Sequence, residues 1–292
     1  MSDYTVRAIS PDGEVRGFAA LTKELVQELQ RRHQTLPVAS AALGRTATMG
    51  AIMGCMLKAE KDQVTIQVEG DGPLGRMMVD ANGKGEVRGY VDNPAVLLPL
   101  NQAGKLDVAA AVGKGSIYIL KDLGLKEPYR GTSPIISGEL AEDFTYYFTA
   151  SEQIPSSVGL GVLVNRDQIL AAGGYLIQVM PGATEETISR LEQKISTLAS
   201  VTDFFHGGGT PEDLLIHLMG EDTRILERQP VTFACKCSRE RTEAMLKSLG
   251  SDELRSILEE QNQAEVLCHF CNEKYVFDRS RLEEMIAELG HA

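Results

Sequence analysis

The chain of 292 residues contains no tryptophan, and aromatic residues make up only 5% of it. Its unfolding therefore gives no tryptophan fluorescence signal. Basic residues are also few: 29 lysines and arginines stand against 41 aspartates and glutamates, which leaves a formal net charge of −12. Nucleic acids and anionic membranes attract basic surfaces, so this balance argues against either as the main partner.

The sequence also lacks a long hydrophobic run. Residues 37–57 come nearest to one, but Arg45 interrupts them and large apolar side chains are few, so we expect a closely packed, buried helix. The first residues have neither the basic region nor the apolar core of a secretory signal peptide. We therefore expect a cytoplasmic protein in a reducing compartment, where paired cysteines act as metal ligands or redox sensors. Cys55, in the expected helix, is predicted to be a buried and unreactive thiol.

Motifs of common enzyme sites are missing, including a phosphate-binding loop, a locally supported Ser-His-Asp triad and the zinc deaminase signature. Residues 70–75 do match G-x-G-x-x-G and follow a predicted strand. A dinucleotide site also needs a helix directly after the glycines, whose N-terminus binds the pyrophosphate. Here Pro73 precedes a further strand and a second glycine-rich turn at residues 82–85, which is typical of a β-meander. We reject the nucleotide site and predict no catalytic residue and no enzyme activity.

A chain of this length suggests about two domains. Residues 1–180 are predicted to form an α+β core domain, with a helix that carries Leu25, Val26 and Leu29 on one face and further helices near residues 37–57 and 139–151. Its strands are expected where apolar residues alternate, at residues 4–9, 14–18, 64–68, 76–79, 86–91, 116–120, 158–164 and 169–179.

Strand signals stop after Pro181, and residues 181–230 are predicted to be a helical linker. Thr184 can cap a first helix that carries one apolar stripe, and Thr210 with Pro211 can begin a second one that ends at Gly220. Two interpretations stay open. The segment is either an ordinary helical layer on the core or a connector whose apolar face is covered in one state and free in another.

Residues 231–292 are predicted to form a small C-terminal domain with two short strands, near residues 265–267 and 275–277. Serines are expected to begin its three helices: Ser238, Ser251 and, with Glu283, Ser280.

Four of the five cysteines lie in this domain, as Cys235 with Cys237 and Cys268 with Cys271. Four thiolates in two close pairs have the number and softness of a closed tetrahedral zinc site, which has no open position for a substrate. The same thiols could instead be oxidised to disulfides and release the metal. Four unrelated buried cysteines would be a simpler interpretation, but the clustering disfavours it. His269 could replace a thiolate, although we expect it to be an exposed loop residue.

The size of the domain makes the metal important. A unit of about 60 residues often reaches only ~3–5 kcal/mol of stability by itself. Structural zinc binding contributes on the order of 10–16 kcal/mol in small zinc-finger peptides. Removal of zinc is therefore expected to unfold the domain, and oxidation of the thiolates would have the same effect.

This cysteine pattern, at the C-terminus of an acidic chain, resembles the heat-shock protein 33 family of redox-regulated chaperones. Residues 70–91 also resemble the N-terminal domain of that family. The resemblance implies an ATP-independent holdase that is inactive when reduced and zinc-bound, and that oxidation activates under heat or another unfolding stress. It implies that the four matching cysteines bind zinc when reduced and form two disulfides when oxidised. It also implies that the linker and the zinc domain then loosen, bind unfolding client proteins and favour a homodimer.

Within this family reading, we expect the disulfides to be Cys235–Cys237 and Cys268–Cys271, because neighbouring thiols have the highest effective concentration for each other. Two other classes remain as alternatives. One is a zinc-ribbon module that binds nucleic acid, against which the net charge speaks. The other is a thiol oxidoreductase that uses Cys268 and Cys271, which would require this pair at the start of a helix rather than in a hairpin.

Overall fold

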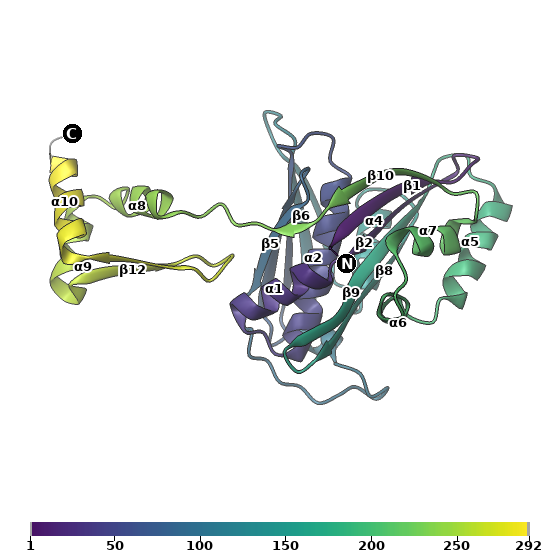
Figure 1. The fold of residues 1–292 in the computed structure, drawn as a ribbon, viewed down its shortest axis with the longest axis horizontal. Helices are drawn as coiled ribbons and strands as arrows, with labels where there is room; N and C mark the ends of the chain where they lie inside the picture. Colours follow the sequence, from purple (N-terminus) through teal and green to yellow (C-terminus); the bar gives the residue numbers. More distant parts are fainter. Residues whose placement is uncertain (1, 291–292) are drawn as a thin grey trace. The chain divides into compact units, whose positions relative to one another are not determined.

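The computed structural model describes residues 2–290 and divides into two compact units, Met1–Ala234 and Cys235–Ala292 (Figure 1). Both units combine helices and strands, which confirms the predicted α+β class. Residues 181–230 lie within the first unit. Whether they act as a separable linker stays a prediction.

The first unit contains a five-stranded antiparallel sheet with the strand order β10-β1-β2-β9-β8. Strands from both ends of the unit therefore lie side by side, and Tyr4 pairs with Pro230 in the register. The strands are β1 (Tyr4–Ile9), β2 (Val15–Leu21), β8 (Ser156–Asn165), β9 (Gln168–Val179) and β10 (Arg224–Pro230).

A second sheet of six strands has the order β11-β5-β4-β3-β6-β7, and only its β11–β5 pair is parallel. Residues 70–75 form the turn from β3 directly into β4, so a strand rather than a helix follows the glycines and the predicted β-meander is confirmed. A Cβ atom at Gly70 would lie 1.9 Å from the Val112 carbonyl oxygen, so close backbone packing explains this glycine. The strands are β3 (Gln63–Gly70), β4 (Arg76–Asn82), β5 (Glu86–Val91), β6 (Gly115–Asp122), β7 (Tyr129–Pro134) and β11 (Thr232–Phe233).

Helix α2 (Pro37–Cys55) contacts strands of both sheets and is buried along nearly its whole length. Its small residues permit this close packing: a Cβ atom at Gly50 would lie 2.7 Å from a methyl group of Val79. The prediction of a buried helix is confirmed, and Cys55 within it is 4% exposed, with its thiol pKa raised by burial. Within residues 2–290, no helix is long and apolar enough to cross a membrane. The other helices of this core are α1 (Lys23–His33), α3 (Val108–Val112) and α4 (Leu140–Ala150).

Helices α5 (Glu185–Thr197), α6 (Val201–His206) and α7 (Pro211–Met219) pack on the five-stranded sheet. The predicted caps are present, because the hydroxyl oxygens of Thr184 and Thr210 accept bonds from backbone N–H groups of α5 and α7. The expectation that residues 181–230 contain no strand is wrong. Strand β10 follows α7, and it escaped notice because its side chains are mostly polar and exposed, as befits a sheet edge.

The second unit consists of a β-hairpin, β12 (Gln263–Leu267) and β13 (Lys274–Asp278), and the helices α8 (Arg239–Lys247), α9 (Ser251–Gln261) and α10 (Arg279–Gly290). The hairpin confirms the two predicted strands. Its small core is built from residues of all five elements, namely Leu246, Leu254, Leu258, Ala264, Phe277, Leu282 and Met285.

Of the three predicted caps in this unit, one is confirmed and two are wrong. The Ser238 hydroxyl accepts a bond from the N–H of Arg241 at the start of α8. Helix α9 instead begins after Gly250, whose φ of +92° suits a glycine. Helix α10 begins before Ser280, and the Asp278 carboxylate accepts the bond from the Arg281 N–H at 3.0 Å.

Candidate metal and thiol site

Four cysteine sulfurs gather in the second unit. Cys235 and Cys237 come from the extended segment before α8, and Cys268 and Cys271 from the turn between β12 and β13. All four sulfurs lie within 4.8 Å of one another, and contacts join the two pairs, at 3.7 Å for Cys235–Cys268 and 3.2 Å for Cys237–Cys271. A tetrahedral zinc ion with Zn–S bonds of 2.3 Å separates its sulfurs by about 3.8 Å. The arrangement therefore fits a zinc ion bound by all four thiolates.

The hairpin turn positions the second cysteine pair through its backbone. The Cys268 N–H donates to the Glu273 carbonyl oxygen at 2.9 Å, and the Asn272 N–H donates to the Cys268 carbonyl oxygen at 2.8 Å. Asn272 adopts a left-handed φ of +58°, which asparagine tolerates better than most residues. Backbone groups of Phe270 and Cys271 hydrogen-bond the Cys268 sulfur. Such bonds favour a charged thiolate.

The first pair lies in a segment without regular secondary structure. Arg241, in the first turn of α8, donates to the Lys236 carbonyl oxygen at 2.8 Å and so fixes the backbone between the two cysteines. The hydroxyl of Tyr275, on β13, donates to the Cys237 sulfur at 3.2 Å. A side chain of the hairpin therefore contacts a cysteine of the other pair.

Burial and hydrogen bonding shift the pKa values of groups in the cluster. Burial raises the pKa of the Cys268 and Cys271 thiols. The hydrogen bond to Cys237 raises the pKa of the Tyr275 hydroxyl, which keeps it a donor at neutral pH. Buried thiols lose their protons readily only when positive charge is close, and a coordinated metal ion deprotonates its thiol ligands outright.

His269 is exposed in the turn between Cys268 and Cys271, which agrees with the predicted loop residue. Sequence reasoning missed Tyr275 as a contact of the cluster. The signal for it was the alternation along β13, which places Tyr275 on the same face as the buried Phe277.

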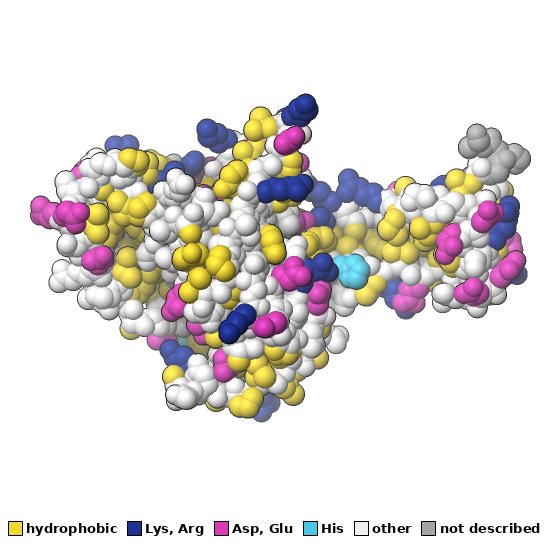
Figure 2. All heavy atoms as spheres, turned by 180° about the vertical axis from the view of Figure 1, so that it is seen from behind, with side chains coloured by type: hydrophobic (Ala, Val, Ile, Leu, Met, Phe, Trp, Pro, Cys, Tyr) yellow, Lys and Arg dark blue, Asp and Glu magenta, His cyan; other side chains and the backbone are white. Residues whose placement is uncertain are grey.

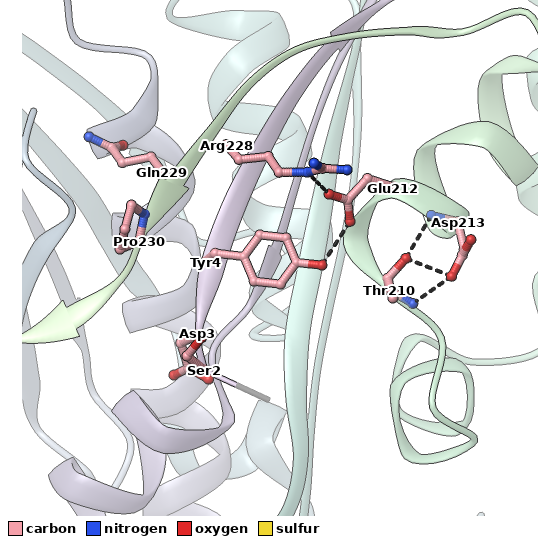
Figure 3. A pocket seen from close by; sticks show the side chains of 9 residues that line it. All are labelled: Ser2, Asp3, Tyr4, Thr210, Glu212, Asp213, Arg228, Gln229 and Pro230. Carbon is pink, nitrogen blue, oxygen red and sulfur yellow. Dashed lines mark hydrogen bonds and ion pairs between the residues drawn. The ribbon is translucent and has the colours of Figure 1, made fainter.

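A polar cluster in the first unit joins three elements (Figure 3). Glu212 on α7 accepts hydrogen bonds from Tyr4 on β1 and from Arg228 on β10. We call these three residues the Glu212 latch. The sequence gives no signal for the contact with Tyr4, which lies 208 positions from Glu212.

The fold and the cysteine cluster define a two-unit α+β protein with a C-terminal four-thiol module. The chain belongs to the Hsp33 family, because the family model described as "Hsp33 protein" matches residues 3–278. The resemblance inferred from the cysteine spacing is thus confirmed.

Relatives match over nearly their whole length. The 33 kDa chaperonin of Geobacillus sp. (strain WCH70) is 55% identical over 98% of this chain and 97% of its own. The 33 kDa chaperonin of Staphylococcus aureus (strain JH9) is 54% identical over 99% of each chain. The crystal structure of the 33 kDa chaperonin (heat shock protein 33 homolog) from Thermotoga maritima superposes with a TM-score of 0.93 at 36% identity, covering 100% of this chain and 99% of that one.

Proposed function

We propose that this Hsp33-family protein is an ATP-independent holdase, switched by the oxidation state of Cys235, Cys237, Cys268 and Cys271. The observation that carries the proposal is the gathering of these four sulfurs within 4.8 Å of one another. The names of the curated relatives support a chaperone function. The client is an unfolding polypeptide, and the protein acts in the cytoplasm without nucleic acid or membrane as a partner.

The reduced state is held by a metal. Bound zinc would neutralise the four thiolates and tie the segment of Cys235 and Cys237 to the hairpin of Cys268 and Cys271. Seven buried residues form the core of this module. A core of this size contributes little to the free energy of unfolding, whereas binding of a structural zinc ion contributes on the order of 10–16 kcal/mol in small peptides. The module therefore depends on its thiolates for its fold.

Oxidation removes those thiolates. The disulfides proposed are Cys235–Cys237 and Cys268–Cys271. Sulfurs also contact one another across the pairs in the reduced cluster, so the proposed pairing rests on chain proximity rather than on these distances. Bridges within pairs leave the two segments unconnected, and the module is then free to unfold.

The surface that binds clients lies beneath residues 181–230. The five-stranded sheet carries an apolar face that includes Val6, Ala8 and Ile177, and helices α5 to α7 cover it. Helix α5 is loosely held, since Thr187 and Leu191 are the only buried residues among its 13. Elsewhere, on the face seen in Figure 2, hydrophobic side chains stand in separate groups between charged ones. Release of the cover would thus expose the larger apolar surface.

The chain itself links the module to this cover. Ala234, whose N–H donates to the Val87 carbonyl oxygen at 3.0 Å, directly precedes Cys235. Strands β10 and β11 precede Ala234 in the chain, and residues 220–223 connect α7 to β10. When the module unfolds, the chain after Ala234 is no longer held in place. The free energy needed to detach the polar edge strand β10 from the sheet is then lower. The active form then dimerises through exposed apolar surface.

The test is an aggregation assay with a thermally unfolding client enzyme. The reduced, zinc-loaded protein should leave aggregation unchanged, and the peroxide-treated protein should suppress it without ATP, with loss of zinc measured in parallel. A Cys55→Ser variant controls for oxidation at the fifth thiol, and should behave as the wild type does. Equal suppression by the reduced and oxidised proteins, with zinc retained in both, would contradict the switch.

A further inference from the structure

Tyr275 is the one tyrosine between Cys235 and Ala292 in the sequence, and its hydroxyl donates to the Cys237 sulfur at 3.2 Å. Its ring is half-buried and packs against the core of the second unit. Opposite it in the hairpin register stands Val266. The backbone of β13 therefore fixes the ring, and the ring fixes where the hydroxyl points.

The two cysteine pairs differ in what their sulfurs contact. The sulfurs of Cys268 and Cys271 contact those of Cys235 and Cys237, and each also bonds to backbone groups of its own turn. Beside its contact with Cys271, Cys237 accepts a hydrogen bond from the Tyr275 side chain, 38 positions away in the sequence. A donor supplied from the hairpin constrains both the position of this sulfur and its electron density, because a hydrogen bond draws charge from a thiolate.

We propose that Tyr275 is a positioning residue of the thiol switch, whose hydroxyl holds Cys237 in the metal-binding arrangement and lowers the reactivity of its sulfur toward peroxide. This role rests on the proposed redox function. It makes Tyr275 a determinant of the oxidant concentration at which the protein activates, although it is neither a ligand nor a redox group itself.

The oxidation step balances with a peroxide as the two-electron oxidant. A thiolate sulfur attacks one peroxide oxygen, so that an S–O bond forms, the O–O bond breaks and hydroxide leaves. The second thiolate then attacks this sulfenic sulfur, the S–S bond forms and a second hydroxide leaves. One peroxide is thus reduced for each disulfide. A hydrogen bond to the attacking sulfur slows the first step and is lost when that sulfur enters a disulfide.

The test compares Tyr275→Phe with the wild-type full chain. Competition with a chromophoric chelator should give about tenfold weaker zinc binding, as is usual when an outer partner of a ligand is lost. Peroxide should release zinc at least about threefold faster, since sulfur nucleophilicity follows basicity with a slope of about 0.4–0.5. In the cobalt(II)-loaded protein, the sulfur-to-cobalt charge-transfer band should move to longer wavelength, because the sulfur gains electron density.

Two variants control for packing. Val266→Ala weakens the hairpin next to Tyr275 without removing the hydroxyl, and should leave the cobalt band in place. Tyr118→Phe removes a hydroxyl from a half-exposed side chain of β6 and should change none of the three readouts. An equal band shift in Val266→Ala and Tyr275→Phe, or no shift in Tyr275→Phe, would overturn the role of the hydroxyl.

The failure of this inference is distinguishable from failure of the proposed function. If wild-type protein releases no zinc with peroxide, the redox function is wrong. If wild-type protein releases zinc and activates, but Tyr275→Phe does so at the same rate and with the same zinc affinity, only the assignment of Tyr275 is wrong.

Discussion

The Tyr4 hydroxyl donates a hydrogen bond of 2.8 Å to the Glu212 carboxylate, although 208 positions separate the two residues in the sequence. Arg228 binds the other oxygen of the same carboxylate, as Figure 3 shows. The Glu212 latch thus joins the first strand of the chain to α7 and β10, both of which belong to the segment proposed to loosen on activation.

Removal of the Tyr4 hydroxyl should loosen that segment. In Tyr4→Phe the opening free energy of residues 181–230 is expected to fall by about 1.5–3 kcal/mol, the range for a hydrogen bond to a charged group. Arg228 contributes less, because its side chain is 66% exposed and surface ion pairs are weak. Native-state hydrogen exchange of the reduced protein measures the change. Tyr146→Phe, on the exposed side of α4, is the matched control, and unchanged protection in α7 and β10 would count against the latch.

The latch should also weaken in acid. Burial alone would raise the pKa of Glu212, but the hydrogen bonds from Tyr4 and Arg228 outweigh it and hold the pKa below its ordinary value of 4.5. A carboxyl whose pKa is lowered by folding contributes stability above its unfolded pKa and loses it as the pH falls through the folded one. The difference in opening free energy between wild type and Glu212→Gln should therefore be constant at neutral pH and shrink below 4.5. A difference that grew as the pH fell would show that folding does not lower the pKa of Glu212.

Chelation of zinc from the reduced protein should unfold the second unit and leave the sheets of the first unit intact. The reason is the imbalance between a small core and a strong metal site. Limited trypsin digestion reads the result, because Arg239, Arg255 and Arg281 lie on helices of the second unit. Cleavage there should become fast while β1 to β9 stay protected from hydrogen exchange. Slow cleavage after complete zinc removal would contradict the dependence on metal.

An ionic network between α8 and α10 should support the module in a salt-dependent way. Arg281 on α10 binds Glu243 on α8, and Lys247 bonds Glu288 at 2.5 Å. The bond from Arg281 is the main reason that the pKa of Glu243 falls to about 2. Arg281→Gln is therefore expected to lower the chelator concentration that unfolds the module at low ionic strength, and to matter less at 1 M salt. Arg255→Gln, which loses an ion pair within α9 alone, is the control.

Mass spectrometry after oxidation decides the disulfide pairing. Cleavage at Arg239 and Arg255 separates the two cysteine pairs, and the main active product should contain Cys235–Cys237 and Cys268–Cys271. The first bridge should be the more easily reduced, because a Cys-x-Cys loop strains the disulfide geometry. Recovery of Cys235 or Cys237 peptides joined to the other pair would show that the zinc-state contacts, rather than chain proximity, select the partner.

Local signals in the sequence were sufficient for most of the fold. Alternating strands such as 64–68 and the small-residue helix around Cys55 could be predicted because each carries its own apolar pattern. Strand β10 could not, since the edge position of Arg224–Pro230 removes the need for that pattern. The cysteine cluster could also be predicted, because the spacing of the cysteines is itself a sequence pattern. The hydrogen bond from Tyr275 to Cys237 was not, because it depends on how the hairpin and the segment before α8 come together.

The pairing of β1 with β10 has a consequence for how the chain is made. Strand β1 is the first strand to leave the ribosome, but its neighbour on one side consists of residues 224–230. Synthesis at about 5–20 residues per second therefore leaves this edge without its partner until most of the translation time has passed. The pairing of β1 with β10 therefore forms late, and it brings together two strands separated by most of the first unit. During its own synthesis, the protein carries the kind of open strand edge that promotes aggregation.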